Sequence, residues 1–282
     1  MNLPPPPARL SQAQRAEFEE HGFLVLPGAL GADQIARFRA LVEAMDRRHR
    51  AQTALPPDGF VEIRNAVAKQ PALLELIDWP AAFPLVVELM GPALQLNTSH
   101  VMIRPPQPAG TPQSFKAIDW HRDGCEEVQA VGGVYPWIYT KIGYFLTDLS
   151  APGRGNLRVV PGSHKRAERP PQSDGRLDPD GALEVLTRPG DAVLFQQRLW
   201  HAVGPNYSSV TRLNIYFGYC YRWVKPLDYL VQPPDLLARA SPIQRQLLGE
   251  YRSEMSFWLP KAEEVPLRTW LDRHLTGAGA SS

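Results

Sequence analysis

The chain of 282 residues has a formal net charge of +1, a hydrophobic content of 44% and a charged content of 21%, which are ordinary values for a soluble globular protein that can bury a core. The nearly balanced charge gives no electrostatic reason to expect nucleic acid or an anionic membrane as a partner. No stretch approaches the roughly 18 apolar residues of a membrane span, the N-terminus lacks the pattern of a signal peptide, and two cysteines make a disulfide framework implausible.

The pattern predicts one cytoplasmic domain over residues 1–282, with flexible tails at 1–10 and 276–282, and it carries no signal of the oligomeric state. Ser11 followed by Gln14 resembles a capping box and marks the start of a first helix. Apolar residues spaced by three and four predict further helices. The elements expected in this first part are a helix at 12–21, a short strand at 23–26, a helix after residue 33, and two helical runs within 71–90.

The middle of the chain is rich in residues that favour strands. The clearest strand is 211–220, where Arg212, Asn214, Tyr216 and Gly218 share one face and apolar residues share the other. Further strands are expected within 94–103, 139–146, 183–186 and 192–195, and helical sequence returns at 242–258. Helices, then strands, then helices predict an α+β protein with a β core wrapped by N- and C-terminal helices.

Four residues suggest a metal site with a cosubstrate. His121 and Asp123 are followed, 80 residues after the first histidine, by His201, and Arg212 comes 11 residues later. Two imidazoles and one carboxylate on one side of a metal leave the other side open, which is typical of non-haem iron(II) oxygenases. A guanidinium one strand away can pair with the far carboxylate of 2-oxoglutarate. The set therefore predicts an iron(II)- and 2-oxoglutarate-dependent dioxygenase.

Several separated motifs resemble the phytanoyl-CoA dioxygenase family, and they occur in the family's order from about residue 15 to 225. They are Gly22 to Leu30, the His121–Asp123 pair, Gly155 to His164, Gly190 to Phe195, Trp200-His201 and Arg212. The resemblance implies a double-stranded β-helix, a jelly-roll barrel of the cupin type. It also implies that the protein uses iron(II), 2-oxoglutarate and O2, and acts on a small-molecule substrate.

The resemblance assigns roles to particular residues. It implies that His121, Asp123 and His201 bind the iron and that Arg212 pairs with the distal carboxylate of 2-oxoglutarate. Two more residues, Arg64 and Met102, are expected near the cosubstrate.

One position departs from the family pattern. Some members carry a serine two residues after the distal histidine, and this chain has Val203 there. Asn214 is the candidate substitute for that second cosubstrate contact, and the alternative is that the contact is absent.

The expected outcome is hydroxylation of an unactivated C–H bond with release of succinate and CO2. Because Asp123 is present where related halogenases have a small residue, hydroxylation is favoured over halogenation. Two alternatives stay open: the same oxidative chemistry ending in desaturation, cyclisation or epimerisation, and a β-barrel metalloprotein without oxygenase activity, against which Arg212 argues. The sequence does not identify the substrate.

Other residues that attract attention are expected to be structural. His164 in the Pro-Gly-Ser-His motif is interpreted as part of a turn. His100 lies on a predicted strand and either lines the pocket or fills the core. Cys125 and Cys220 are expected to be passive.

Overall fold

The computed structural model describes residues 9–108, 110–111, 119–124 and 128–275. The predicted tails fall almost wholly outside these residues, as does Cys125. Within the described part of the chain, no helix has both the length and the apolar character needed to cross a bilayer.

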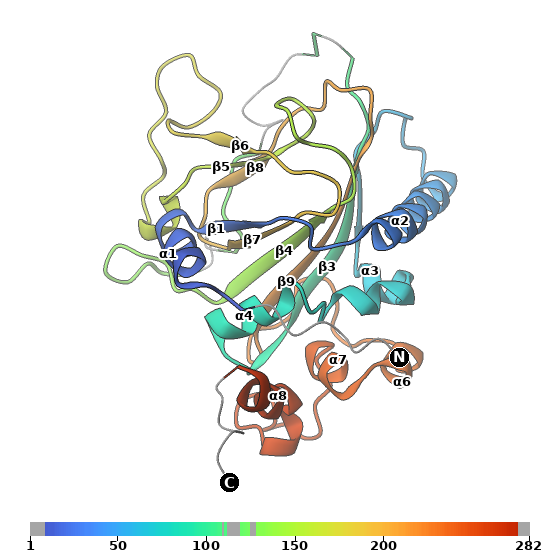
Figure 1. Ribbon diagram of the computed structural model, residues 1–282, viewed down its shortest axis with the longest axis vertical. Helices are drawn as coiled ribbons and strands as arrows, with labels where there is room; N and C mark the ends of the chain where they lie inside the picture. The colour runs from blue at the N-terminus through green and yellow to red at the C-terminus, as the bar shows by residue number, and fades with distance from the viewer. Residues whose placement is uncertain (1–8, 109, 112–118, 125–127, 276–282) are drawn as a thin grey trace.

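The core is built from two antiparallel β-sheets that pack against each other (Figure 1). The larger sheet contains, in spatial order, β1 (Phe23–Leu26), β7 (Ala192–Gln196), β4 (Tyr139–Phe145), β9 (Arg212–Tyr221), β3 (Leu94–Arg104) and β2 (Val61–Arg64). The smaller sheet contains β6 (Leu183–Val185), β5 (Leu157–Val159) and β8 (His201–Val203). Buried residues of both sheets, including Phe145, Leu157 and Phe195, form a shared apolar cluster. This arrangement confirms the predicted double-stranded β-helix.

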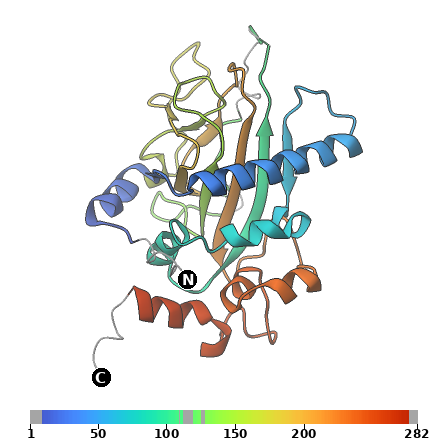
Figure 2. The same ribbon diagram turned by 45° about the vertical axis from the view of Figure 1, so that its right-hand side comes forward.

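Helices cover the outer face of the larger sheet and one of its ends. The N-terminal group is α1 (Gln12–His21), α2 (Ala32–Gln52), α3 (Ala66–Lys69), the 3₁₀ helix η1 (Pro71–Leu76) and α4 (Phe83–Met90). The C-terminal group is α6 (Pro234–Arg239), α7 (Pro242–Leu247), η3 (Ala262–Glu264) and α8 (Pro266–His274), and a short η2 (Ser163–Lys165) lies between β5 and β6. Figure 2 shows α2 running across the strands, with the C-terminal helices at the lower end of the sheet.

The alternation predicted for β9 decides which side chains face the site. Leu213, Ile215 and Phe217 belong to the main core cluster, where the helices pack on the sheet. Arg212 and Tyr216, on the opposite side of the same strand, are buried between the two sheets and hydrogen-bonded to each other. A strand with one apolar face and one polar face therefore forms part of both the core and the cavity.

The predicted helix starts and ends are partly confirmed. Ser11 and Gln14 form the predicted capping box of α1, and Gly22 ends this helix in the left-handed region at φ 82°. The helical prediction for 242–258 is too long, because α7 ends at Leu247 and Gly249 then takes φ +78°. Strands β2, β5 and β8 and helices α3, α6 and α8 were not predicted.

Candidate functional site

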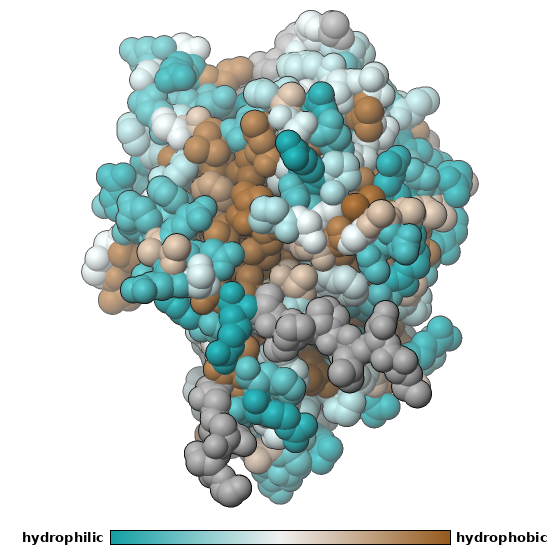
Figure 3. All heavy atoms as spheres, viewed as in Figure 1, coloured by the Kyte–Doolittle hydropathy of each residue, from teal (hydrophilic) through white to brown (hydrophobic). Residues whose placement is uncertain are grey.

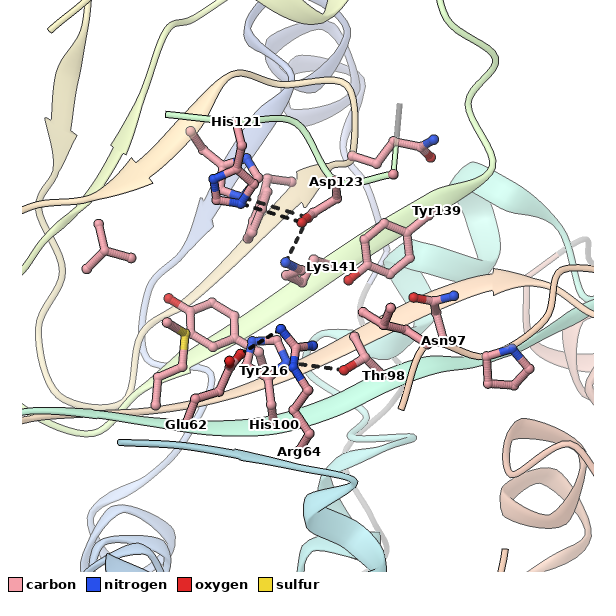
Figure 4. A pocket seen from close by; sticks show the side chains of 18 of the residues that line it. Glu62, Arg64, Asn97, Thr98, His100, His121, Asp123, Tyr139, Lys141 and Tyr216 are labelled. Carbon is pink, nitrogen blue, oxygen red and sulfur yellow. Dashed lines mark hydrogen bonds and ion pairs between the residues drawn. The ribbon is translucent and has the colours of Figure 1, made fainter. Parts of the chain in front are cut away.

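The triad predicted from the sequence comes together where a loop pairs with β8. His121 and His201 exchange two backbone hydrogen bonds of 3.0 Å, and the amide of Asp123 donates to the carbonyl of Gln197 at 3.0 Å. Each oxygen of the Asp123 carboxylate faces one imidazole: Oδ1 lies 3.7 Å from Nε2 of His121, and Oδ2 lies 3.7 Å from Nε2 of His201 (Figure 4). One atom from each of the three side chains therefore lies within 4.8 Å of the others.

Nδ1 of each triad histidine already has a hydrogen-bond partner. Nδ1 of His121 lies 2.6 Å from the carbonyl oxygen of Asp119, and Nδ1 of His201 lies 2.9 Å from that of Leu199. A carbonyl only accepts, so Nδ1 carries the proton in both rings and each Nε2 keeps its lone pair. This pattern orients metal-binding histidines in general, and the donor set of two Nε2 atoms and one carboxylate suits iron(II).

A buried lysine balances the charge of the triad carboxylate. Nζ of Lys141, on β4, lies 2.7 Å from Oδ2 of Asp123 (Figure 4). Burial alone would raise the pKa of the Asp123 carboxyl, but Lys141 and the two imidazoles outweigh burial and hold this pKa below its usual range. Burial and the neighbouring His121 lower the pKa of His201 to about 3. The carboxylate is therefore ionised and His201 neutral at physiological pH, as metal binding requires.

Arg212 is fully buried on the inner face of β9, one layer behind the cavity wall. Its Nη2 donates to the hydroxyl of Tyr216 at 2.7 Å, and Tyr216 lines the cavity. Its Nε and Nη1 are buried and have no hydrogen-bond partner among the described residues. A buried guanidinium with two free donors is costly unless an anion binds it, which fits the expected carboxylate of 2-oxoglutarate.

A second arginine accompanies the first. Arg104 stands directly opposite Arg212 in the β3–β9 register, and it lines the cavity. Gly155 makes room for both, since a Cβ at this position would lie 3.0 Å from Cδ of Arg212 and 3.5 Å from Cδ of Arg104. Burial and the nearby Arg212 lower the pKa of Arg104 to about 10, so it stays charged at neutral pH.

The other residues expected near the cosubstrate lie at different depths. Met102 and Val203 line the cavity, and Arg64 lines it while pairing with Glu62 at 2.9 Å. Asn214 is completely buried, and neither its Nδ2 nor its Oδ1 has a partner in the described part of the structure. Asn214 is thus a polar group in need of a partner beside Arg212, although it is not part of the cavity wall.

His100 lines the cavity rather than filling the apolar core. Its ring stacks on Tyr216 at 5.1 Å, and its Nδ1 lies 3.3 Å from Oγ1 of Thr98, which donates to Oδ2 of Asp228 at 2.8 Å. Because the threonine hydroxyl gives its proton to Asp228, it accepts from Nδ1 of His100 and leaves the histidine Nε2 as an acceptor. Burial, with Lys141 and Arg64 nearby, holds the pKa of His100 well below its usual value.

The cavity has a volume of about 650 Å³ and is open to solvent. Two tyrosines form part of its floor by lying across glycines of the neighbouring strand: Tyr216 lies over Gly143, and Tyr139 lies over Gly218, where a Cβ would overlap each ring. Phe60, Ile138 and Leu227 add apolar lining. Such a cavity suits a small organic molecule beside the triad.

Outside the cavity, the surface is mixed. Figure 3 shows one face of the molecule, on which hydrophobic residues gather in a central strip between hydrophilic flanks. His164 is buried, with Nε2 3.1 Å from the carbonyl of Glu19 and its ring against Gly22, so its structural interpretation is confirmed. Cys220 is a buried free thiol whose pKa burial raises to about 12, as expected of a passive cysteine.

The fold and the triad define the class of protein: a non-haem iron oxygenase that uses 2-oxoglutarate. The family model described as phytanoyl-CoA dioxygenase (PhyH) matches residues 18–214. The chain therefore belongs to the phytanoyl-CoA dioxygenase family, and it is an iron- and 2-oxoglutarate-dependent oxidoreductase.

Relatives and solved structures agree with this assignment. The ectoine dioxygenase of Bordetella parapertussis is 24% identical over 241 residues, which cover 74% of this chain and 75% of that protein. The carbocyclase SnoK from nogalamycin biosynthesis aligns with a TM-score of 0.60 and 22% identity, covering 87% of this chain and 95% of that one. HygX from Streptomyces hygroscopicus, solved with nickel and 2-oxoglutarate, aligns with a TM-score of 0.60 and 20% identity, covering 83% and 95%. At these identities the two structures establish the shared fold.

Proposed function

We propose that His121, Asp123 and His201 bind iron(II), and that Arg212 pairs with the distal carboxylate of 2-oxoglutarate. The observation that carries this proposal is the convergence of two free Nε2 atoms and one ionised carboxylate at the edge of a cavity. The free donors of Arg212 beneath the same cavity support the second part. Bound there, iron(II) would let O2 and 2-oxoglutarate together supply the oxidising equivalent for a substrate C–H bond.

The positions of the side chains support some candidates for the second cosubstrate contact more than others. Arg104 and the hydroxyl of Tyr216 are in the cavity wall, whereas Val203 offers no polar atom. We therefore propose Tyr216 and Arg104 as the contacts that take the place of the family serine, with Asn214 behind them. Arg64 and Met102 remain proposed as cavity residues near the cosubstrate.

The proposed reaction is hydroxylation of an unactivated C–H bond of a small molecule. Asp123 supports it, because the carboxylate occupies the position that a halide would need. The named activities of SnoK, a carbocyclase, and of SnoN, an epimerase, show that proteins of this fold reach other outcomes. Cyclisation and epimerisation are therefore the second candidate, and the pose of the substrate in the cavity decides between them.

The remaining proposals concern the whole chain. We propose that residues 1–282 form one domain in the cytoplasm, which the free thiol of Cys220 supports. The net charge of +1 supports a small-molecule substrate over nucleic acid.

An anaerobic titration of the metal-free protein tests the function. Iron(II) and 2-oxoglutarate together should produce a weak visible charge-transfer band, and neither should produce it alone. Air should then convert 2-oxoglutarate to succinate. Iron that binds without the band, and without any succinate in air, would contradict the proposal and favour a metalloprotein without oxygenase activity.

A further inference from the structure

Lys141 is a buried cation at the triad that belongs to none of the sequence motifs. Only 10% of its side chain is exposed, and Nζ lies 2.7 Å from Oδ2 of Asp123. The rings of Tyr139 and Phe195 flank the ammonium group, with their centroids 5.7 Å and 5.4 Å from Nζ. Both rings present their electron-rich faces to a cation, so Lys141 is held at the carboxylate rather than being free to turn into solvent.

The charges around Lys141 do not balance within the described residues. Arg212, which is fully buried, and Arg104, which is partly buried, add two more cations to the same cavity region, and neither forms an ion pair with a described carboxylate. The other described acidic groups of the cavity wall do not compensate: Glu62 pairs with Arg64, and the side chain of Asp119 is 83% exposed. Three buried or partly buried cations therefore accompany one partly buried carboxylate, that of Asp123.

This excess of positive charge has opposite effects on the binding of the metal ion and on the binding of 2-oxoglutarate. A divalent cation at the triad is repelled by Lys141, which also occupies one oxygen of Asp123. A dianion in the same cavity is attracted by all three cations, and it offsets the cost of burying them. Low solvent access strengthens both effects.

Resting on the proposed function, we propose that Lys141 is a charge-balancing residue that weakens metal binding at the triad and strengthens 2-oxoglutarate binding. The metal-free site then has its own affinity for the dianion. Arg104, which also lines the cavity but is less buried than Lys141, acts in the same sense.

The test measures two affinities in the full-length protein by isothermal titration calorimetry. Mn²⁺ serves as a redox-inert probe for iron(II), and 2-oxoglutarate is titrated separately into protein treated with EDTA. Lys141→Met should bind Mn²⁺ about tenfold more tightly than the wild type and 2-oxoglutarate about tenfold more weakly. Lys225→Met, which removes an exposed lysine at the rim of the same cavity, should change either affinity by less than about threefold, because water screens its charge.

Opposite signs distinguish this role from a structural one, since a damaged site would lose affinity for both probes. Weaker Mn²⁺ binding by Lys141→Met with an unchanged melting temperature would overturn the inference, because Lys141 would then position Asp123 for the metal. If wild-type protein bound 2-oxoglutarate only after Mn²⁺, the metal-free site would have no affinity of its own for the dianion and this inference alone would fail. If it bound neither probe in any combination, the proposed function would fail. Should Lys141→Met not fold, Lys141→Gln, which removes the charge but keeps a hydrogen-bond donor, decides, with the same signs expected.

Discussion

The substitution Arg212→Met should separate the effect of this residue on protein stability from its effect on 2-oxoglutarate binding. The guanidinium is fully buried, and two of its nitrogens have no partner among the described residues. Hydrogen bonds to charged groups contribute about 1.5–3 kcal/mol each, so losing a two-bond pair with a carboxylate costs roughly 3 kcal/mol or more. At about 1.4 kcal/mol per factor of ten, Arg212→Met should bind 2-oxoglutarate about 100-fold more weakly.

The same substitution should not destabilise the ligand-free protein. It removes a buried charge and its repulsion with Arg104, and it leaves only the hydroxyl of Tyr216 without its partner. A net gain of about 1 kcal/mol corresponds to a rise in melting temperature of about 2 °C in a domain of this size. Differential scanning calorimetry without ligands, together with fluorescence titration of 2-oxoglutarate in the presence of Mn²⁺, measures both effects.

Arg222 provides the matched control. It is also a buried arginine with two unpartnered nitrogens, but it packs over Tyr251 near the C-terminal helices. Arg222→Met should therefore leave 2-oxoglutarate affinity unchanged. A melting temperature lowered by several degrees in Arg212→Met, with nearly normal 2-oxoglutarate affinity, would show that Arg212 is structural and would refute the assignment.

Three further predictions address the triad, the turn histidine and the cavity floor. Asp123→Ala should abolish metal binding and destabilise the protein by up to roughly 3 kcal/mol, because it leaves Lys141 buried without its partner. Adding Lys141→Met to this variant should restore stability but not metal binding. Calorimetry and Mn²⁺ titration measure both effects, and full stability of Asp123→Ala alone would contradict the prediction. Burial lowers the pKa of His164 to about 4, so the unfolded chain binds an extra proton and stability, complete above pH 6.5, falls as the pH drops from 6.5 towards 4. In urea melts, His164→Gln should reduce this decline by at most ~1.4 kcal/mol per pH unit, and an unchanged slope would count against it. Gly218→Ala should displace Tyr139, one of the two rings that flank Lys141, and should therefore reduce both substrate turnover and 2-oxoglutarate affinity, measured by succinate release and binding titration.

The elements that depend on local pattern could be predicted from the sequence. The capping box of Ser11 and Gln14 and the alternation of Arg212 and Tyr216 along β9 are set by residues close in the chain, and the structure shows both. The 3.6-residue pattern did not show that α7 ends at Leu247. The residues just before Gly249 are still rich in apolar side chains, so the pattern does not mark the turns that begin at this glycine. Local pattern therefore determined the elements better than their ends.

The residues that were missed depend on the pairing of distant strands. Arg104 becomes a site residue only because β3 pairs with β9 in the register that sets it opposite Arg212. Lys141 lies in a strand that is buried on both faces, so alternation gave no sign that it points to the triad. Its partner Asp123 is on a loop that is fixed by the carbonyl of Gln197. No spacing in the sequence encodes these three contacts.

The glycines in the middle of β4 and β9 are an indication of the site that can be recognised in the sequence. A glycine inside a strand weakens it unless another group needs the space above the backbone. Gly143 and Gly218 are covered by Tyr216 and Tyr139, each reaching across from the neighbouring strand. Because Tyr216 holds Arg212 and Tyr139 flanks Lys141, the two glycines indirectly position both cations. The interior glycines of this sheet are therefore a second sequence signal of the site, besides the triad.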